Sequence, residues 1–236
     1  MAVTAINLRK DYTDPSGHVA TILDVAHFHI ADADHVALVG GSGTGKTTLL
    51  HCLAGIVAPT DGEVRFHTDH EPPEQGVDIA GLSEPRRDAF RGKYLGYVFQ
   101  THHLLPGFTA LENVLLGMSF TGKTADRDHA RHLLEEVGMA DRLHYKPGKL
   151  SVGQQQRVAV ARALASKPAL VLADEPTGAL DPATAQSVLD LIRRLCTEAG
   201  SALVVVTHDR DLAGQLPTVV DLADINRVAS LQEAAS

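Results

Sequence analysis

The stretch HVALVGGSGTGKTTLL, His35–Leu50, decides the fold of this chain. Its apolar run Val36–Val39 predicts a buried strand, and apolar residues at helical spacing follow from Lys46. Between them, residues 40–47 fit the pattern G-x-x-x-x-G-K-[ST]. Glycines in such a loop let backbone N–H groups turn inward around phosphate oxygens, and the following helix points the positive end of its dipole at the same place. The sequence therefore predicts a strand–loop–helix unit that binds a nucleoside triphosphate.

Two side chains of this loop have specific chemistry. Lys46 places a positive charge at the β- and γ-phosphates, and the hydroxyl of Thr47 is placed to ligate Mg²⁺. A glycine-rich turn without a ligand is the alternative, and the strand and helix on either side argue against it. The residues expected at the nucleotide are Gly40, Ser42, Gly43, Thr44, Gly45, Lys46, Thr47 and Thr48.

Length and composition are those of a globular protein. The chain has 236 residues, a hydrophobic fraction of 44% and a net charge of -8. This length suits one α/β domain, residues 1–236, with a small appended lobe. No apolar run approaches the roughly 18 residues that a membrane span needs, and the N-terminus lacks the apolar core of a signal peptide. We therefore expect a cytoplasmic protein, and the acidic charge disfavours binding to nucleic acid.

Cysteines and histidines invite metal or redox interpretations. Cys52 and Cys196 have no metal-binding spacing, and we expect neither a disulfide nor a reactive thiol. The thirteen histidines are scattered or come in close pairs, which do not build a four-ligand set. We predict no zinc site.

An antiparallel layer is expected ahead of the glycine-rich loop. Residues 3–9 and 19–30 have the partly alternating pattern of strands with one solvated face, joined by a turn at 14–17. Tyr12 lies just before this turn. Its ring could stack on an adenine or pack on a neighbouring strand, and the spacing does not decide between them.

The middle of the chain is predicted to contain another strand and then a helical lobe. The acidic, proline-containing residues 67–78 predict an exposed loop. YLGYVF, Tyr94–Phe99, predicts a buried strand ending at Gln100, which could contact Mg²⁺ and water or only cap the strand. Thr109 and Glu112 predict a helix start, and Ala130, Leu133, Leu134 and Val137 form a helical apolar stripe.

Three later groups complete the pattern. Ser151 precedes a helix and could be a simple cap or part of an anion site. PALVLADE, residues 168–175, predicts a buried parallel strand ending in Asp174, which can hold Mg²⁺, and Glu175, which can act as a base on water. A third buried strand, residues 201–207, ends at His208. Ligands of open α/β sheets bind at such strand ends.

In this order, the motifs resemble those of the nucleotide-binding subunits of ABC transporters over nearly the whole chain. The resemblance favours a functional role for Gln100, Ser151 and His208, and makes Tyr12 an adenine-stacking residue. Val152 stands where the commonest form of the signature has glycine. The matches are GGSGTGKT with the Walker A loop, Gln100 with the Q-loop, LSVGQQQR with the signature, LVLADE with Walker B, Ala179-Leu180-Asp181 with the D-loop and His208 with the switch histidine.

What the resemblance implies is an α/β P-loop ATPase core with a parallel sheet, an antiparallel β layer and an inserted helical lobe. Residues 1–100 and 156–236 would form the core and residues 101–155 the helical subdomain. Each ATP would lie between the loop of one subunit and the signature of a second copy in a head-to-tail dimer. Beside the loop residues, the nucleotide would be contacted by Tyr12, Ser151, Gly153, Gln154 and Asp181. The Mg²⁺ ligands would be Thr47, Gln100 and Asp174. The catalytic residues would be Glu175 as base, His208, Gln100 and Lys46.

Within this family, YLGYVFQ, LLPGFTALENV and LSVGQQQR are similar to the LolD/MacB/DevA-type branch of lipoprotein-releasing and macrolide-exporting systems. The expected partner is an integral membrane permease, which would hold the subunit at the inner face of the cell membrane. An FtsE-like signalling ATPase is an alternative with the same motifs. A soluble ABC ATPase is the other alternative, and the chain lacks the long coiled coils and zinc cysteine pairs typical of that class. The sequence does not identify a substrate or a transport direction.

Overall fold

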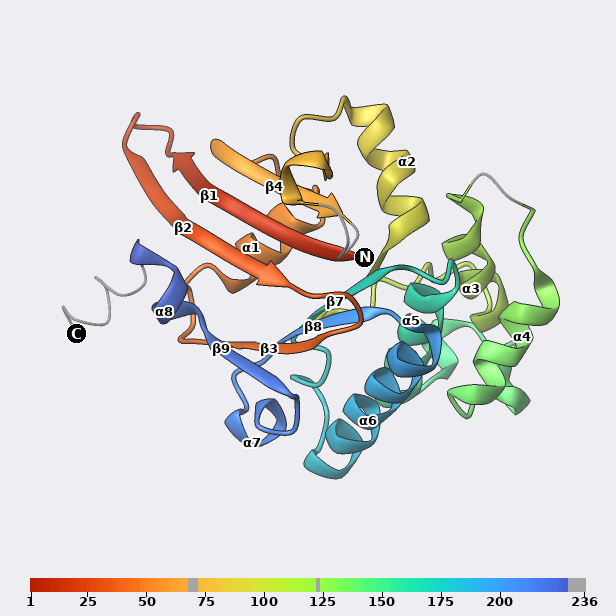
Figure 1. Cartoon of the computed structure of the whole chain (residues 1–236). Helices are drawn as coiled ribbons and strands as arrows, with labels where there is room; N and C mark the ends of the chain where they lie inside the picture. Colours follow the sequence, from red (N-terminus) through yellow and green to blue (C-terminus); the bar gives the residue numbers. More distant parts are fainter. Residues whose placement is uncertain (68–71, 122–123, 229–236) are drawn as a thin grey trace. The chain divides into compact units, whose positions relative to one another are not determined.

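The computed structural model describes residues 1–67, 72–121 and 124–228 (Figure 1). Two compact units are found in it. The first contains residues 1–87 and the stretch from residue 204 onward, and the second contains residues 88–203. The segment 101–155, predicted as the helical subdomain, lies wholly within the second unit, and its limits stay a prediction.

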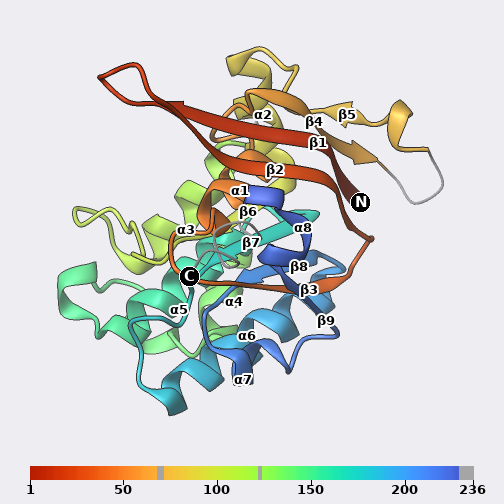
Figure 2. The same cartoon turned by 90° about the vertical axis from the view of Figure 1, so that its left-hand side faces the viewer.

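An antiparallel sheet dominates the first unit, with the strand order β2-β1-β4-β5. Figure 1 shows β1 between β2 and β4, and Figure 2 shows β5 beyond β4. The turn between β1 and β2 forms at the predicted residues, where the Asp14 carboxylate accepts the N–H groups of Ser16 and His18. The strands are β1, Ala2–Thr13; β2, Val19–Ile30; β4, Asp61–His67; and β5, Val77–Asp78.

The glycine-rich loop of this unit lies between a strand and a helix, as predicted. Strand β3, His35–Val39, is buried at every position and pairs in parallel with β9, Thr218–Asp221. Helix α1, Lys46–Leu53, follows the loop and packs against β2. Two short helices, α7 at Arg210–Ala213 and α8 at Leu222–Ile225, complete the C-terminal part of the unit.

The second unit pairs a parallel β-ladder with helices. Its strands β6 and β7 run parallel. The two division points in the sequence, 87/88 and 203/204, fall inside helix α2 and strand β8. All five residues of β8 are buried. The elements are α2, Glu84–Tyr94; β6, Leu95–Val98; α3, Ala110–Ser119; α4, Arg127–Glu136; α5, Val152–Leu164; β7, Leu170–Asp174; α6, Pro182–Ala199; and β8, Ala202–Val206. Single 3₁₀ turns lie at Pro73–Gln75, Ala140–Arg142 and Pro147–Lys149.

Local signals in the helical lobe are confirmed. Thr109 and Glu112 form a reciprocal capping box at the start of α3. The predicted apolar stripe of α4 and the residue after it is buried throughout, with Ala130, Leu134 and Val137 fully covered. The stripe therefore faces the core of the second unit.

The prediction for residues 67–78 was wrong in part. Residues 68–71 lie outside the described part of the chain, but Val77 and Asp78 form β5, paired with Phe66 and Arg65 of β4. The Asp78 carboxylate accepts the N–H groups of Val64, Ala80 and Gly81. Arg65 of β4 also donates to the carbonyls of Glu74 and Gly76, so side-chain hydrogen bonds hold a segment that lacks an apolar period.

Asn113 on α3 shows how a loop of the second unit is held. Its side chain is fully buried, accepts the N–H of Leu105, and donates to the carbonyls of Leu105, Phe108 and Thr109. These bonds replace water for the backbone of residues 105–109.

We predict that Asn113→Ala lowers the free energy of unfolding by about 1–3 kcal/mol, because it leaves buried backbone groups without partners. The measurement is the midpoint of urea unfolding. Thr109→Ala, which removes only the cap of the same helix, should cost about 1 kcal/mol. An unchanged midpoint for Asn113→Ala would contradict this account.

Candidate nucleotide-binding site

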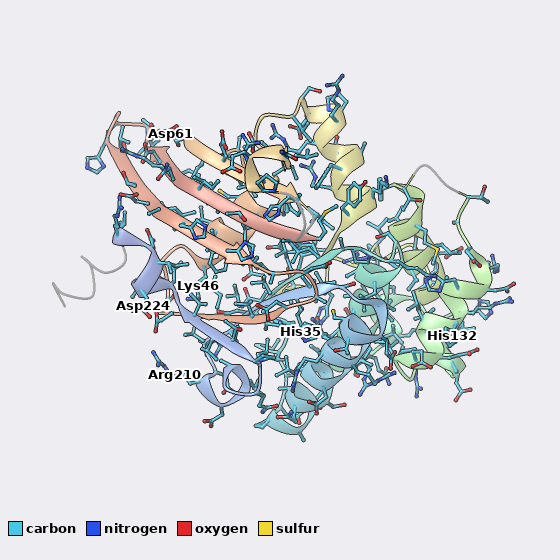
Figure 3. All side chains as sticks on the ribbon, in the orientation of Figure 1. His35, Lys46, Asp61, His132, Arg210 and Asp224 are labelled. Atoms are coloured by element: carbon cyan, nitrogen blue, oxygen red, sulfur yellow. The ribbon has the colours of Figure 1, made fainter. Side chains whose placement is uncertain are left out.

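The glycine-rich loop is closed around a buried lysine. Lys46, labelled in Figure 3, is the first residue of α1 and is only 7% exposed. Its Nζ donates to the carbonyl of Gly40 at 2.8 Å and also to that of Gly41. The Thr44 hydroxyl donates to the Gly41 carbonyl at 2.9 Å. The ammonium group therefore lies within the curve of the loop, where it can meet a phosphate oxygen.

Only glycine fits position 45, where the loop turns into α1. Its φ is 104°, in the left-handed region, and an added Cβ would lie 3.0 Å from Leu23 Cδ2 and 3.1 Å from the Ile22 carbonyl oxygen. Gly45 has no side chain that could accept the N–H groups of the first helical turn. These groups, with the exposed hydroxyl of Thr47 beside them, suit an anion with its metal ion.

Tyr12 and His208 belong to the same unit as the loop. Tyr12 is 45% exposed, lies opposite Ala20, and has Lys10 Nζ at 5.1 Å from its ring centre. His208 is exposed and follows β8. The Thr207 N–H donates to the Leu38 carbonyl of β3, so the histidine and the loop follow neighbouring strand ends.

Two carboxylates end strand β7 in the second unit. Asp174 is its last residue and is 8% exposed. Burial, together with the charge of Asp174, raises the pKa of Tyr97 on the neighbouring strand. Glu175 has a φ of 44°, which is uncommon for a residue with a side chain and is typical of functional turns. Gln100 Nε2 donates to Glu175 Oε2 at 3.3 Å, so the structure brings these two predicted residues together.

The signature residues begin helix α5. Ser151 Oγ accepts the Gln154 N–H at 3.3 Å, and Gln154 Oε1 accepts the Ser151 N–H at 3.0 Å. The cap that the sequence left as an alternative therefore forms, and the hydroxyl proton of this exposed serine can still be donated to an anion. A Cβ at Gly153 would lie 2.9 Å from Thr184 Cγ2 on α6, so close packing also requires this glycine.

Asp181 has the same kind of role at the start of α6. Its carboxylate accepts the Thr184 N–H at 3.0 Å. Hydrogen bonds from the Thr184 side chain and backbone lower the pKa of Asp181. The aspartate is therefore an ionised helix cap.

A cavity of about 530 Å³ lies in the second unit. Aromatic side chains from β6 and the end of α3 line it together with two arginines. Arg162 donates to the carbonyls of His102 and His103, and burial lowers the pKa of this arginine. The residues that line the cavity include Arg91, Tyr97, Phe99, Phe120 and Arg162.

Sequence reasoning also missed Asn226, because a buried asparagine carries no signal in the sequence. Its side chain is fully buried and bonds to the carbonyl of Thr44 in the glycine-rich loop. Only the fold brings these two residues together.

The predicted oxygen donors suit magnesium, which prefers hydroxyl, carboxylate and carbonyl oxygens. Thr47 lies in the first unit, and Gln100 and Asp174 lie in the second. In the described ranges, no group of three or more His, Cys, Asp or Glu side chains could hold a metal ion. The magnesium set and the absence of zinc both stay predictions.

Comparisons with known proteins agree with these features. The sequence profile of the ABC transporter family matches residues 23–178. The lipoprotein-releasing system ATP-binding protein LolD of Bordetella pertussis is 45% identical over 216 residues, which are 91% of this chain and 90% of that protein. The LolD of Geobacter metallireducens is 46% identical over 224 residues, 93% and 96% of the two chains.

Solved structures give the same result. The dimeric ATP-binding cassette MJ0796, in a post-hydrolysis state bound to ADP and Pi, superimposes with a TM-score of 0.82 at 34% identity and with 93% of each chain covered. A second dimeric structure of this bacterial ABC transporter cassette matches equally well. The α/β P-loop fold expected from the sequence is thereby confirmed. The chain belongs to the ABC transporter family, as one of its ATP-binding and ATP-hydrolysing subunits.

Proposed function

We propose that this chain drives a membrane transporter of the lipoprotein-releasing type, by closing as a head-to-tail dimer around two ATP molecules. The observation that carries the catalytic part is Glu175, held in a left-handed conformation at the end of a buried strand and bonded to Gln100. The lipoprotein-releasing part is supported by relatives of that name, which match over at least 90% of both chains.

Each of the following site residues has a defined role in this proposal. Lys46 and the loop N–H groups bind the phosphates, and the ring of Tyr12 stacks on the adenine. Thr47, Asp174 and Gln100 hold Mg²⁺, which neutralises phosphate charge when bound. Glu175 takes the proton of the attacking water, and His208 contacts the γ-phosphate. Gln100 keeps the Glu175 carboxylate in place through their hydrogen bond.

A second copy completes each site. Ser151, Gly153 and Gln154 present the start of α5, and the Ser151 proton is directed at the γ-phosphate of the other copy. Asp181 lies at the start of the neighbouring helix α6 in the same unit. The dimeric structures of the related cassette, one of them bound to ADP and Pi, support this arrangement.

The cavity of the second unit is the proposed docking site for the membrane permease. It is lined by Tyr97 and Phe99, which lie within the three residues before Gln100, and by the 64% exposed Phe120. Within the described part of the chain, no helix is long and apolar enough to cross a membrane. The permease would then hold this subunit at the inner face of the membrane.

We predict that Glu175→Gln lowers ATP turnover by about 10²–10⁴-fold, because the amide cannot accept the proton of water. ATP affinity should change little, since the phosphate contacts remain. Turnover and nucleotide binding are measured on the purified chain. Glu198→Gln, at an exposed glutamate of α6, is the matched control and should hydrolyse ATP normally. Wild-type turnover in Glu175→Gln would remove Glu175 as the base.

Ser151→Arg should block ATP-dependent dimerisation, because its bulk occupies the position of the other copy's phosphate. It also removes the cap of α5, which costs about 1 kcal/mol. Thr109→Ala removes an equivalent capping box of α3 and should dimerise normally, which separates the two effects. Size-exclusion chromatography with ATP measures the result, and normal dimerisation of Ser151→Arg argues against a shared site.

Phe120→Glu should weaken binding to membranes that contain the cognate permease, because it replaces an exposed apolar side chain of the cavity lining with a charged one that is costly to bury against a partner. Val219→Glu changes an apolar residue that is 49% exposed and lies in the other unit, so it should bind normally. Co-sedimentation with these membranes is the measurement. Equal binding of the two variants would exclude the cavity as the docking site.

A further inference from the structure

The side chain of Asn226 links separate segments of the first unit by hydrogen bonds, and this set of bonds is called the tie below. Its side chain has an exposed fraction of 0%. The residue follows α8, whose first turn is capped by Asp221, and its own N–H donates to the Leu222 carbonyl at 2.8 Å. A bridge to Val25 places it beside β2. The backbone of Asn226 is therefore held by α8 and by β2.

The Asn226 amide has all its hydrogen-bonding groups in use. Its Nδ2 donates to the Ile22 carbonyl at 3.0 Å and to the Thr44 carbonyl at 3.2 Å. Its Oδ1 accepts the Asp24 N–H at 2.9 Å and the Val228 N–H at 3.4 Å. One side chain thus joins strand β2, the glycine-rich loop and the C-terminal segment.

The bond to Thr44 fixes the direction of a neighbouring donor. The Thr44 carbonyl and the Gly45 N–H belong to one planar trans peptide, so they point in opposite directions. With the carbonyl held by Asn226, the Gly45 N–H is directed away from Asn226. Rotation of this peptide would present a carbonyl oxygen where the loop presents an N–H group, and a phosphate would be repelled.

Close packing reinforces this tie. The Ile22 carbonyl that Asn226 holds is the same group that a Cβ at Gly45 would approach to 3.1 Å. The loop and β2 are in close contact at this point, and Asn226 bonds to a carbonyl of each of them.

We propose that Asn226 is a positioning residue for ATP, which keeps the Gly45 N–H directed at the nucleotide phosphates. This inference rests on the proposed role of the glycine-rich loop as the phosphate site. Asn226 touches no substrate atom and acts only through the Thr44–Gly45 peptide.

The test compares Asn226→Ala and Asn226→Asp with Asn113→Ala in the purified full chain. Asn226→Ala removes the tie, and Asn226→Asp keeps its shape but lacks the two donated bonds, so either variant that folds tests the inference. Asn113 is a matched control because it is equally buried and also bonds to four backbone groups, in the other unit. The KM for ATP, kcat and the thermal midpoint are measured well below unfolding.

We expect the KM for ATP to rise at least about tenfold in the Asn226 variants, as expected for the loss of a well-directed hydrogen bond to a charged group. kcat at saturating ATP should stay within about threefold, because the bond is made equally before and during reaction. Asn113→Ala should lower the thermal midpoint and leave KM unchanged. A KM unchanged in the Asn226 variants, or raised equally in Asn113→Ala, would overturn the inference.

Lys46→Ala separates this inference from the proposed function. If Lys46→Ala binds ATP normally, the loop is not the phosphate site and the proposed function fails with the inference. If Lys46→Ala loses ATP binding while the Asn226 variants keep a normal KM, only the role of Asn226 is wrong.

Discussion

Complete burial of three short strands limits where the predicted site residues can lie along the chain. Every residue of β3, β7 and β8 is buried, so none of these strands can carry an unpaired charge along its length. The polar groups therefore come at the strand ends: the glycine-rich loop after β3, Asp174 and Glu175 at the end of β7, and His208 after β8. Burial therefore restricts the charged and polar residues of the predicted site to the ends of these strands.

Features that depend on neighbouring residues could be predicted from the sequence. The glycine pattern of residues 40–47, the Thr109 cap and the apolar stripe of α4 are each local, and each was found where expected. The strand β5 was missed because it is held by side-chain bonds of Asp78 and Arg65, which no apolar pattern indicates. The tie at Asn226 was missed because it depends on a long-range contact that no local pattern encodes. The left-handed backbone of Glu175 was missed as well, because no residue pattern around it indicates a positive φ.

Several of the predicted site residues also have structural roles within their own chain. Ser151 and Asp181 each cap a helix, and the two helices pack together in the second unit. The cap uses a lone pair of the serine oxygen and leaves its proton unused. A residue type chosen for helix stability is thus compatible with a role at an anion. For this reason the local pattern around Ser151 left both interpretations open, and only the resemblance to the family favoured a functional role.

The tie between Asn226 and Thr44 spans 182 positions of the chain. During synthesis the glycine-rich loop leaves the ribosome long before the residue that holds its peptide in place. The strand–loop–helix unit can form early, because its contacts are local, but the long-range bond must wait. The order of translation thus delays the finished phosphate loop until the C-terminal segment has been made.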